Sequence, residues 1–338
     1  MLPLHMIGIL GAGAMGSALA AHLAREGRDV TLCATIYDAQ AAHAIEHGLP
    51  HPGLGIALGK GIRVAGPDEW PDALAAMRIV TVAVSTSGLA GVIEDAARSS
   101  QPEALWAIAT KGWEETTLRS SATVASDTLG DPSRVVQIVG PSLAVEVAAG
   151  VPTGVVAACV HLPSAIAVAE AFASPRLHVR ATTDVIGVEI GSALKNVIAI
   201  AVGLCDGVAE HEGRAWTNTK AMLFSRGLAE MRQLVRASGG DVDTVIGLAG
   251  SGDLFVTCLG GRNARFGRLV GLGTPPKVAL EEMNTTVEGY ANAPAAAALA
   301  AKFGLDLSIV RAVNAVLFEG MGAEEAIRSL SGGVGIDR

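Results

Sequence analysis

The first half of the chain alternates short apolar runs with longer segments whose apolar residues recur at helical spacing. Short apolar runs between helical stretches are typical of parallel strands that are buried on both faces of a sheet. The pattern predicts strands at residues 6–10, 29–34, 62–64, 79–84, 105–109, 135–139, 154–158 and 178–180. We therefore expect an α/β fold with a largely parallel, doubly wound sheet.

The second half of the chain is almost entirely helical in pattern. Glycine-rich segments at 238–240, 250–252 and 260–261 predict breaks between its helices. A chain of 338 residues exceeds the usual size of one domain. We expect a sheet domain at residues 1–182 and an all-helical domain at residues 183–338, packed tightly because no linker separates them.

The segment 184–207, DVIGVEIGSALKNVIAIAVGLCDG, carries apolar residues on nearly every face of a helix. Such a helix is buried on all sides, which makes Lys195 and Asn196 in its middle conspicuous. Burial disfavours a charged ammonium and lowers its pKa, so a buried lysine can accept and donate protons. A structural lysine, held by a buried carboxylate or at a helix-helix contact, is the alternative. The segment is long enough to span a bilayer, but the polar residues inside it favour the core of a soluble protein.

The first predicted strand runs directly into Gly11-Ala12-Gly13-Ala14-Met15-Gly16, and a helical segment follows. This is a GxGxxG motif between a strand and a helix, the setting in which it binds dinucleotides. Gly11 would make the tight turn, Gly13 would let the backbone approach a pyrophosphate, and Gly16 would allow close helix packing. The motif predicts a dinucleotide-binding domain of the Rossmann type.

The choice between NAD and NADP is open at this point. An acid at the end of the second strand favours the ribose hydroxyls of NAD, and a nearby arginine favours the phosphate of NADP. The strand ends in CATIYD, residues 33–38, with neither group directly at its end. Thr35 could hydrogen-bond either ligand.

Polar residues follow three of the predicted strands, where the ligands of open parallel sheets bind. Ser85 follows the strand at 79–84, Lys111 the strand at 105–109, and Ser142 the strand at 135–139. Each residue alone is more often a cap or a turn residue than a ligand. Three of them beside one glycine loop favour a binding site.

The segment 247–267, GLAGSGDLFVTCLGGRNARFG, carries the polar residues of interest in the second half. Asp253 is isolated among apolar and small residues, so it could orient Lys195 or a substrate hydroxyl. Arg262 and Asn263 offer a forked guanidinium and an amide after two glycines, a set suited to a phosphate. A solvated arginine in a surface loop is the alternative for Arg262.

The formal net charge of -8 and the lack of a basic run argue against nucleic-acid or anionic-membrane partners. The four cysteines are far apart and have no histidines at metal-ligand spacing, and His47 and His51 straddle Pro50 in an expected loop. We therefore predict no metal site. Isolated cysteines and an N-terminus without signal-peptide features favour a cytoplasmic protein without membrane insertion.

Nine motifs of this sequence resemble those of the NAD- or NADP-dependent glycerol-3-phosphate dehydrogenases. They run nearly end to end: GAGAMGSALA, TKGWE, VGPSLAVEVA, DVIGVEIGSALKNVIAIAVG, TNTKA, SRGLAEM, GLAGSGDLFVTC, GGRNARFG and TTVEGYANA. The resemblance implies a Rossmann domain, an all-helical domain, NAD or NADP as the cofactor, and a phosphorylated small molecule as the substrate. The implied reaction interconverts dihydroxyacetone phosphate and sn-glycerol 3-phosphate by hydride transfer.

The resemblance also implies residue roles by matching position. It implies Lys195 as the general acid/base, with Lys111 adding positive charge beside the developing alkoxide and Asp253 as a further catalytic residue. The implied substrate contacts are Lys111, Ser142, Asn196, Asp253, Arg262 and Asn263, of which the last two hold the phosphate. The implied cofactor contacts are Gly11, Gly13, Ala14, Met15, Gly16, Thr35, Ser85, Lys111, Ala144, Arg262 and Glu288.

The sequence departs from the family pattern at several positions. Ala14-Met15 stands where many bacterial members have Ser-Trp, Thr35 replaces a frequent arginine, and Gly261 replaces a serine. These variants, with HPGLG and VSTSG, are closer to the archaeal branch. The alternatives are a dehydrogenase of another short polyol phosphate, a ketopantoate-reductase-like enzyme, and a non-enzymatic cofactor-sensing protein. A homodimer through the helical half is compatible with the sequence.

Overall fold

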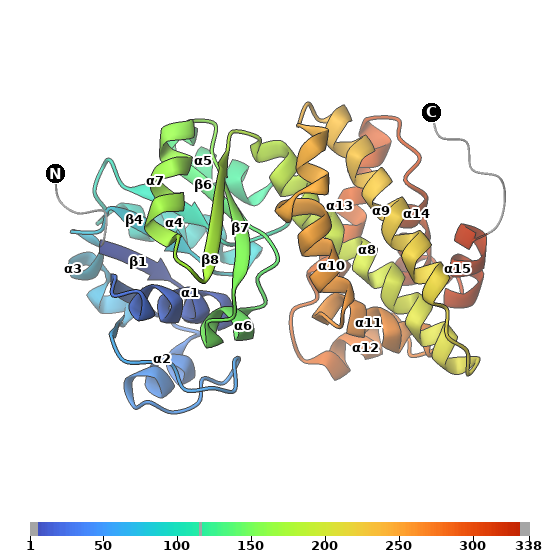
Figure 1. Cartoon of the computed structure of the whole chain (residues 1–338), viewed down its shortest axis with the longest axis horizontal. Coiled ribbons are helices and arrows are strands. Elements are labelled where there is room, and N and C mark those ends of the chain that lie inside the picture. Colours follow the sequence, from blue (N-terminus) through green and yellow to red (C-terminus); the bar gives the residue numbers. More distant parts are fainter. Residues whose placement is uncertain (1–5, 115–116, 332–338) are drawn as a thin grey trace. The chain divides into compact units, whose positions relative to one another are not determined.

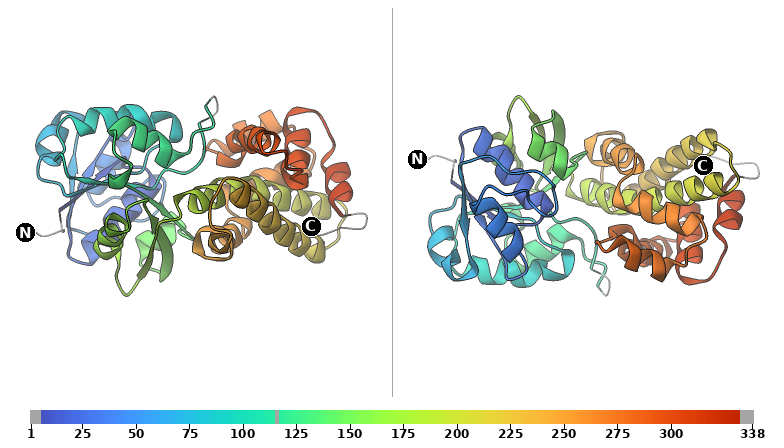
Figure 2. Two further views of the ribbon diagram at one scale, coloured as in Figure 1. Left: turned by 90° about the horizontal axis from the view of Figure 1, so that it is seen from above. Right: turned by 90° about the horizontal axis from the view of Figure 1, so that it is seen from below.

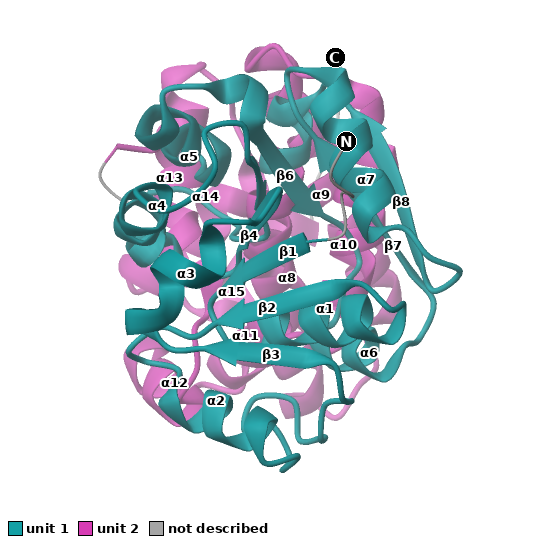
Figure 3. Ribbon diagram, turned by 90° about the vertical axis from the view of Figure 1, so that its left-hand side faces the viewer, with its two compact units in different colours: residues 1–114, 119–189 teal, residues 115–118, 190–338 magenta. Residues whose placement is uncertain are grey.

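A computed structural model describes residues 6–114 and 117–331 of the chain (Figure 1). The chain forms two compact units, coloured separately in Figure 3. Unit 1 comprises Met1–Glu114 with Arg119–Glu189, and unit 2 comprises Glu115–Leu118 with Ile190–Arg338. The division into domains at residues 1–182 and 183–338 stays a prediction.

Unit 1 is built on one eight-stranded sheet in the order β3-β2-β1-β4-β5-β6-β7-β8. The strands are β1 (Met6–Leu10), β2 (Asp29–Cys33), β3 (Ile62–Ala65), β4 (Ile79–Val82), β5 (Leu105–Ile108), β6 (Val135–Val139), β7 (Thr153–Ala158) and β8 (Leu177–Thr182). All eight strands expected from the apolar runs are present. Every neighbouring pair is parallel except β6 and β7, so the expectation of a largely parallel sheet is confirmed.

Helices cover both faces of this sheet, as Figure 3 shows. Helices α1 (Ala14–Arg25) and α7 (Leu162–Phe172) pack against one face, where Ile7 and Ile9 are fully buried. Helices α3 (Trp70–Leu74), α4 (Leu89–Ala97) and α5 (Ser121–Leu129) pack against the other face around Trp106. Unit 1 also holds α2 (Ala39–Glu46) and α6 (Ala144–Ala149). Burial on both faces of the six inner strands explains their nearly continuous apolar runs.

Unit 2 is helical over its described residues. Helix α8 (Val185–His211) enters it, and α9 (Thr217–Ala237), α10 (Asp253–Cys258), α11 (Arg262–Gly271), α12 (Pro276–Met283), α13 (Glu288–Lys302), α14 (Ser308–Phe318) and α15 (Ala323–Ser331) follow. Every residue from 190 to 205 is buried, and Figure 2 shows other helices of the unit on several sides of α8. Helix α8 is long and apolar enough to cross a bilayer, but 89% of its most apolar window is buried inside the protein.

Glycines let two helices approach α8 closely. A Cβ atom at Gly203 of α8 would lie 2.1 Å from the carbonyl oxygen of Ala264 in α11, and one at Gly267 would lie 2.3 Å from that of Ile200.

The break expected at residues 250–252 was wrong, because a π-helical turn (Leu248–Gly252) continues directly into α10. A Cβ at Gly191 would lie 2.8 Å from the carbonyl oxygen of Ala249. These glycines thus mark tight packing, and the turn leads straight to Asp253.

Candidate active site

The glycine loop of unit 1 has the geometry that a dinucleotide requires. Gly11 has φ +100°, and a Cβ on Gly16 would lie 2.0 Å from the carbonyl oxygen of Gly11. A Cβ on Gly13 would meet no atom within 4 Å, and Gly13 precedes the first turn of α1. Backbone N–H groups at the start of a helix bind phosphate, so the space in front of Gly13 fits a pyrophosphate.

The peptide groups of Ala12 are held from both sides. The N–H of Ala12 donates to Oδ2 of Asp38 at 3.0 Å. Its carbonyl accepts from the hydroxyl of Ser17 at 3.0 Å and lies 2.9 Å from Nε2 of buried His51. The N–H of Gly53 donates to Nδ1 of His51 at 3.1 Å, so Nε2 carries the proton and donates to Ala12. These contacts fix the two peptide groups that flank Ala12 in the loop.

No acid stands directly at the end of β2, but Asp38 lies close to it in space. A turn over residues 36–37 brings Asp38 back toward the strand end, where its Oδ2 accepts from the N–H of Thr35 at 2.8 Å and from its hydroxyl at 2.7 Å. The glycine loop is tied to the same point, because the N–H of Gly11 donates to the carbonyl of Cys33 at 2.9 Å. Asp38 lies five residues beyond the strand end at Cys33, so strand position alone did not indicate it.

Hydrogen bonds between neighbouring strand ends position the backbone of Lys111. The amide of Gln137 on β6 donates to the carbonyl of Thr110 at 2.8 Å. The hydroxyl of Thr110 donates to the carbonyl of Val84 at 2.8 Å, and that of Thr86 donates to the carbonyl of Lys111 at 3.0 Å. Sequence reasoning missed Thr110 and Gln137, whose only signal was a polar side chain within or directly after a buried strand.

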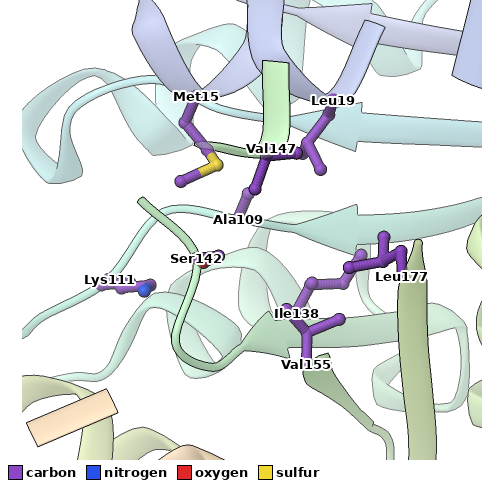
Figure 4. A pocket seen from close by; sticks show the side chains of 9 residues that line it. All are labelled: Met15, Leu19, Ala109, Lys111, Ile138, Ser142, Val147, Val155 and Leu177. Atoms are coloured by element: carbon purple, nitrogen blue, oxygen red, sulfur yellow. The ribbon is translucent and has the colours of Figure 1, made fainter. Parts of the chain in front are cut away.

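Three of the expected site residues line one pocket of unit 1, which has about 320 Å³ of empty space including open solvent. Its walls are mostly apolar, and Lys111 and Ser142 lie together at one end (Figure 4). Met15 of the glycine motif lines the same pocket. The pocket thus combines a largely apolar wall with an ammonium and a hydroxyl.

The remaining cofactor candidates of unit 1 lie at element ends. Thr35 uses its hydroxyl on Asp38 and accepts from the N–H of Tyr37 at 3.3 Å. Ser85 is exposed after β4, with its hydroxyl 3.2 Å from that of Ser87. Ala144 begins α6, which packs against α1. Their contacts with a cofactor stay predictions.

In unit 2 the structure pairs Lys195 with Asp253. The ammonium nitrogen lies 2.5 Å from Oδ1 of Asp253, and the two side chains are 6% and 2% exposed. A buried charge is stable only with a partner, so the carboxylate balances the ammonium in the core. Of the two possibilities for Asp253, the structure shows the contact with Lys195. A lysine fixed at this position can donate a proton to an oxygen of a molecule that is bound beside it.

A network of amides connects Asn196 and Asn263 with Glu288. Asn196 donates to Oε2 of Glu288 at 2.9 Å and accepts from the amide nitrogen of Asn263 at 2.9 Å. Asn263 in turn accepts from the N–H of Gly289 at 2.8 Å. Both asparagines are thus held by protein partners, which makes them positioning residues for the start of α13. One N–H of Asn263 remains to contact a ligand.

Arg262 is the first residue of α11 and follows Gly260, which has φ +119°. Its guanidinium is half exposed, lies 3.5 Å from a carboxylate oxygen of Glu288, and donates to the hydroxyl of Thr285 at 3.4 Å. A guanidinium at the N-terminus of a ten-residue helix suits a phosphate. The turn at Gly260 and Gly261 precedes this group, which lies at the unit's surface.

Three groups outside the expected site have pKa values raised by burial. Glu189 is 8% exposed, and burial raises its pKa to about 7 although Ser120 and Ala122 donate hydrogen bonds to it. Burial raises the pKa of Cys33 and Cys258 to about 12, so neither thiol is a nucleophile at neutral pH. Over residues 6–114 and 117–331, no group of three His, Cys, Asp or Glu side chains is arranged to hold a metal.

A hydride that leaves or reaches a carbon bound to oxygen must be matched by a proton on that oxygen. The glycine loop suits the hydride carrier, and the buried Lys195 suits the proton. Fold and site together therefore define the class of nicotinamide-dependent dehydrogenases.

The chain belongs to the NAD-dependent glycerol-3-phosphate dehydrogenase family. The profile of the family's N-terminal domain matches residues 6–165, and that of its C-terminal domain matches residues 184–328. Glycerol-3-phosphate dehydrogenase [NAD(P)+] of Trichlorobacter lovleyi is 38% identical over 96% of both chains. The NADP(+)-dependent enzyme of the archaeon Archaeoglobus fulgidus is 34% identical over 96% of this chain and 99% of its own.

A solved structure agrees with this assignment. The crystal structure of glycerol-3-phosphate dehydrogenase from Coxiella burnetii superposes with a TM-score of 0.86 and 31% identity. The match covers 97% of this chain and 99% of that one. The expected fold, a Rossmann-type sheet followed by a helical half, is thereby confirmed, as is the resemblance on which the residue roles were based.

Proposed function

We propose that the protein interconverts dihydroxyacetone phosphate and sn-glycerol 3-phosphate with NAD(H) or NADP(H), using Lys195 as the general acid/base. The observation that carries the residue assignment is the buried ion pair of Lys195 and Asp253 at 2.5 Å. The full-length relatives are named for this reaction, and their names include both NAD(P)+ and NADP(+). The nicotinamide group supplies or accepts the hydride when it is bound.

The proton step belongs to Lys195. In the direction of reduction its ammonium donates a proton to the oxygen at C2 as negative charge develops there. In the reverse direction the neutral amine accepts the proton from the C2 hydroxyl. Asp253 holds the lysine in place and balances its charge, so it serves as a positioning residue in both directions.

The phosphate end of the substrate is the proposed task of Arg262, Asn263 and the first N–H groups of α11. The guanidinium offers paired donors, and the helix end adds a partial positive charge. Binding energy from a phosphate that does not react holds C2 in position and so contributes to turnover as well as affinity. Lys111 and Ser142, from the pocket of unit 1, are the other proposed substrate contacts.

The proposal is tested by following the nicotinamide absorbance of NADH or NADPH with dihydroxyacetone phosphate. Lys195→Ala should lower turnover on the order of a thousandfold, because general acid/base catalysis and charge stabilisation are both lost. Lys220→Ala is the matched control, since Lys220 pairs with Asp206 at 2.7 Å in the same unit but is 38% exposed. Near-normal turnover of the Lys195 variant would exclude the assigned role.

Binding of both cofactors without oxidation by dihydroxyacetone phosphate would overturn the substrate but leave the fold and cofactor assignments. Ketopantoate and other short polyol phosphates are then the next substrates to assay. A cytoplasmic location and a homodimer are further proposals. Light scattering of the purified chain tests the dimer directly.

A further inference from the structure

We propose that Asp38 binds the hydroxyls of the adenosine ribose of the cofactor and makes this chain prefer NAD over NADP. The inference rests on the proposed function for the presence of a nicotinamide dinucleotide. It adds a specificity-determining residue that the strand position did not reveal.

The first observation is the place of the carboxylate. Oδ2 of Asp38 accepts hydrogen bonds from the N–H of Ala12 at 3.0 Å and from the N–H of Thr35 at 2.8 Å. Ala12 belongs to the glycine loop, and Thr35 stands two residues after the end of β2. The carboxylate therefore lies where the acid of NAD-binding Rossmann domains meets the ribose, although it comes from a position further along the chain.

The second observation is the direction of the hydrogen bonds. All three donors, including the hydroxyl of Thr35 at 2.7 Å, donate their hydrogen bonds to Oδ2. Among the described residues, none donates a hydrogen bond to Oδ1. Asp38 is also the N-cap residue of α2, yet its side chain caps no N–H group of that helix. The side chain is thus turned toward the loop, with one oxygen fixed and the other available to ribose hydroxyls.

The third observation concerns charge. A ribose hydroxyl donates to a carboxylate, whereas the 2′-phosphate of NADP brings a like charge to the same place. The turn and the start of α2, residues 34–42, contain no Lys or Arg that could hold this phosphate. Arg63 on β3 is exposed and close enough to affect Cys33, but it pairs in register with Thr31, in the middle of β2. Its contribution can be measured separately.

The competing explanation is that Asp38 only supports the glycine loop. His51 provides the matched control, because it holds the same loop residue through the carbonyl of Ala12 and carries no negative charge to the loop. Loosening the loop through His51 should weaken the binding of NAD and NADP alike. Removing the charge of Asp38 should instead change their ratio.

The experiment is isothermal titration calorimetry of the full chain with ADP-ribose and with 2′-phospho-ADP-ribose. These two probes lack nicotinamide, so the result does not depend on turnover. We expect the native protein to bind ADP-ribose at least about tenfold more tightly, because a charge-assisted hydrogen bond is gained and a like-charge contact avoided. Asp38→Asn should reduce this ratio by about tenfold or more, and His51→Ala should weaken both probes and keep the ratio.

Arg63→Gln should leave the ratio unchanged. Thermal unfolding of each variant checks that it is folded, and Asp38→Ser is a second neutral variant should the asparagine fail to fold. Equal binding of the two probes by the native protein, or equal weakening of both by Asp38→Asn, overturns the inference and leaves the proposed function intact. Failure of the native protein to bind either probe overturns both.

Discussion

Removing the buried carboxylate of Glu189 should make the stability of unit 1 less sensitive to pH. Glu189 lies near the start of α8 and caps the N-terminal end of α5, where Oε1 accepts from the N–H of Ala122 at 2.6 Å and Oε2 from the hydroxyl of Ser120 at 2.5 Å. Burial raises its pKa from 4.5 to about 7, against the opposing effect of these two hydrogen bonds. The change to test is Glu189→Gln, which keeps the shape and removes the ionisable group.

The sign follows from the raised pKa. The folded protein holds the proton of Glu189 more tightly than the unfolded chain, so the protonated side chain contributes stability that is fully present below about pH 4.5. That contribution is lost as the pH rises through about 7. A rise of the pKa from 4.5 to about 7 corresponds to roughly 3 kcal/mol.

The assay is urea unfolding of the native protein and of Glu189→Gln across this pH range at constant ionic strength. A Trp216→Phe background leaves Trp70, Trp106 and Trp113 as fluorescent reporters, all in unit 1. The stability of the native protein relative to the variant should fall by roughly 3 kcal/mol toward neutral pH and then stay level.

Glu282→Gln, at an exposed position of α12, controls for the loss of a surface carboxylate. A stability difference between the native protein and Glu189→Gln that stays constant, or that grows as the pH rises, would refute the reasoning.

Two further substitutions test the packing and the ion pair of unit 2. Gly203→Ala places a Cβ 2.1 Å from a backbone oxygen of α11 and should lower the free energy of unfolding by about 1–3 kcal/mol in chemical denaturation. Gly91→Ala, where a Cβ meets nothing within 4 Å in helix α4, should instead raise it by about 0.5–1 kcal/mol, and equal effects at the two glycines would contradict the packing argument. Asp253→Asn leaves the buried ammonium of Lys195 without its carboxylate and should cost about 3–5 kcal/mol in thermal or urea unfolding. Unchanged stability would show that the core does not depend on this pair.

The sheet and the long helix could be predicted from the sequence because elements that are buried on all sides have continuous apolar runs. Each inner strand of the sheet is largely buried on both sides, so its run is visible without knowledge of its neighbours. The edge strands β3 and β8 carry exposed Arg63 and His178. Helix α8 is apolar around its whole circumference, which isolates Lys195 among buried residues. The antiparallel direction of β7 has no such local signal, because strand direction depends on the connection and on the neighbouring strand.

The break expected at residues 250–252 shows where local propensity fails. Glycine weakens an isolated helix, so three residues with two glycines favour a loop. In the folded chain, however, a Cβ at Gly250 would lie 2.1 Å from the carbonyl oxygen of Val245. The glycine is required by the close contact and not by a turn. Only the structure distinguishes these two reasons for the same residue.

The candidate site shows a similar division. The contact between Lys195 and Asp253 was predictable as one of two alternatives for Asp253, because two charged residues isolated in apolar segments need partners. Asp38 was not, because its carboxylate reaches the strand end through a turn and its distance along the chain is misleading. The signal for Asp38 is an acidic residue within reach of the glycine loop, even where it does not stand at the last position of the second strand.

Residues without chemistry of their own also determine the site. Gly203 and Gly267 bring α8 and α11 close enough for Asn196 and Asn263 to share a 2.9 Å hydrogen bond. Through Asn196 that contact fixes the carboxylate of Glu288, which in turn lies 3.5 Å from the guanidinium of Arg262. The orientation of the proposed phosphate-binding arginine therefore depends on the spacing of two helices. A larger residue at Gly203 should displace Arg262 as well as destabilise the core. Phosphate binding by Arg262 should then be weakened although no charged residue has been replaced.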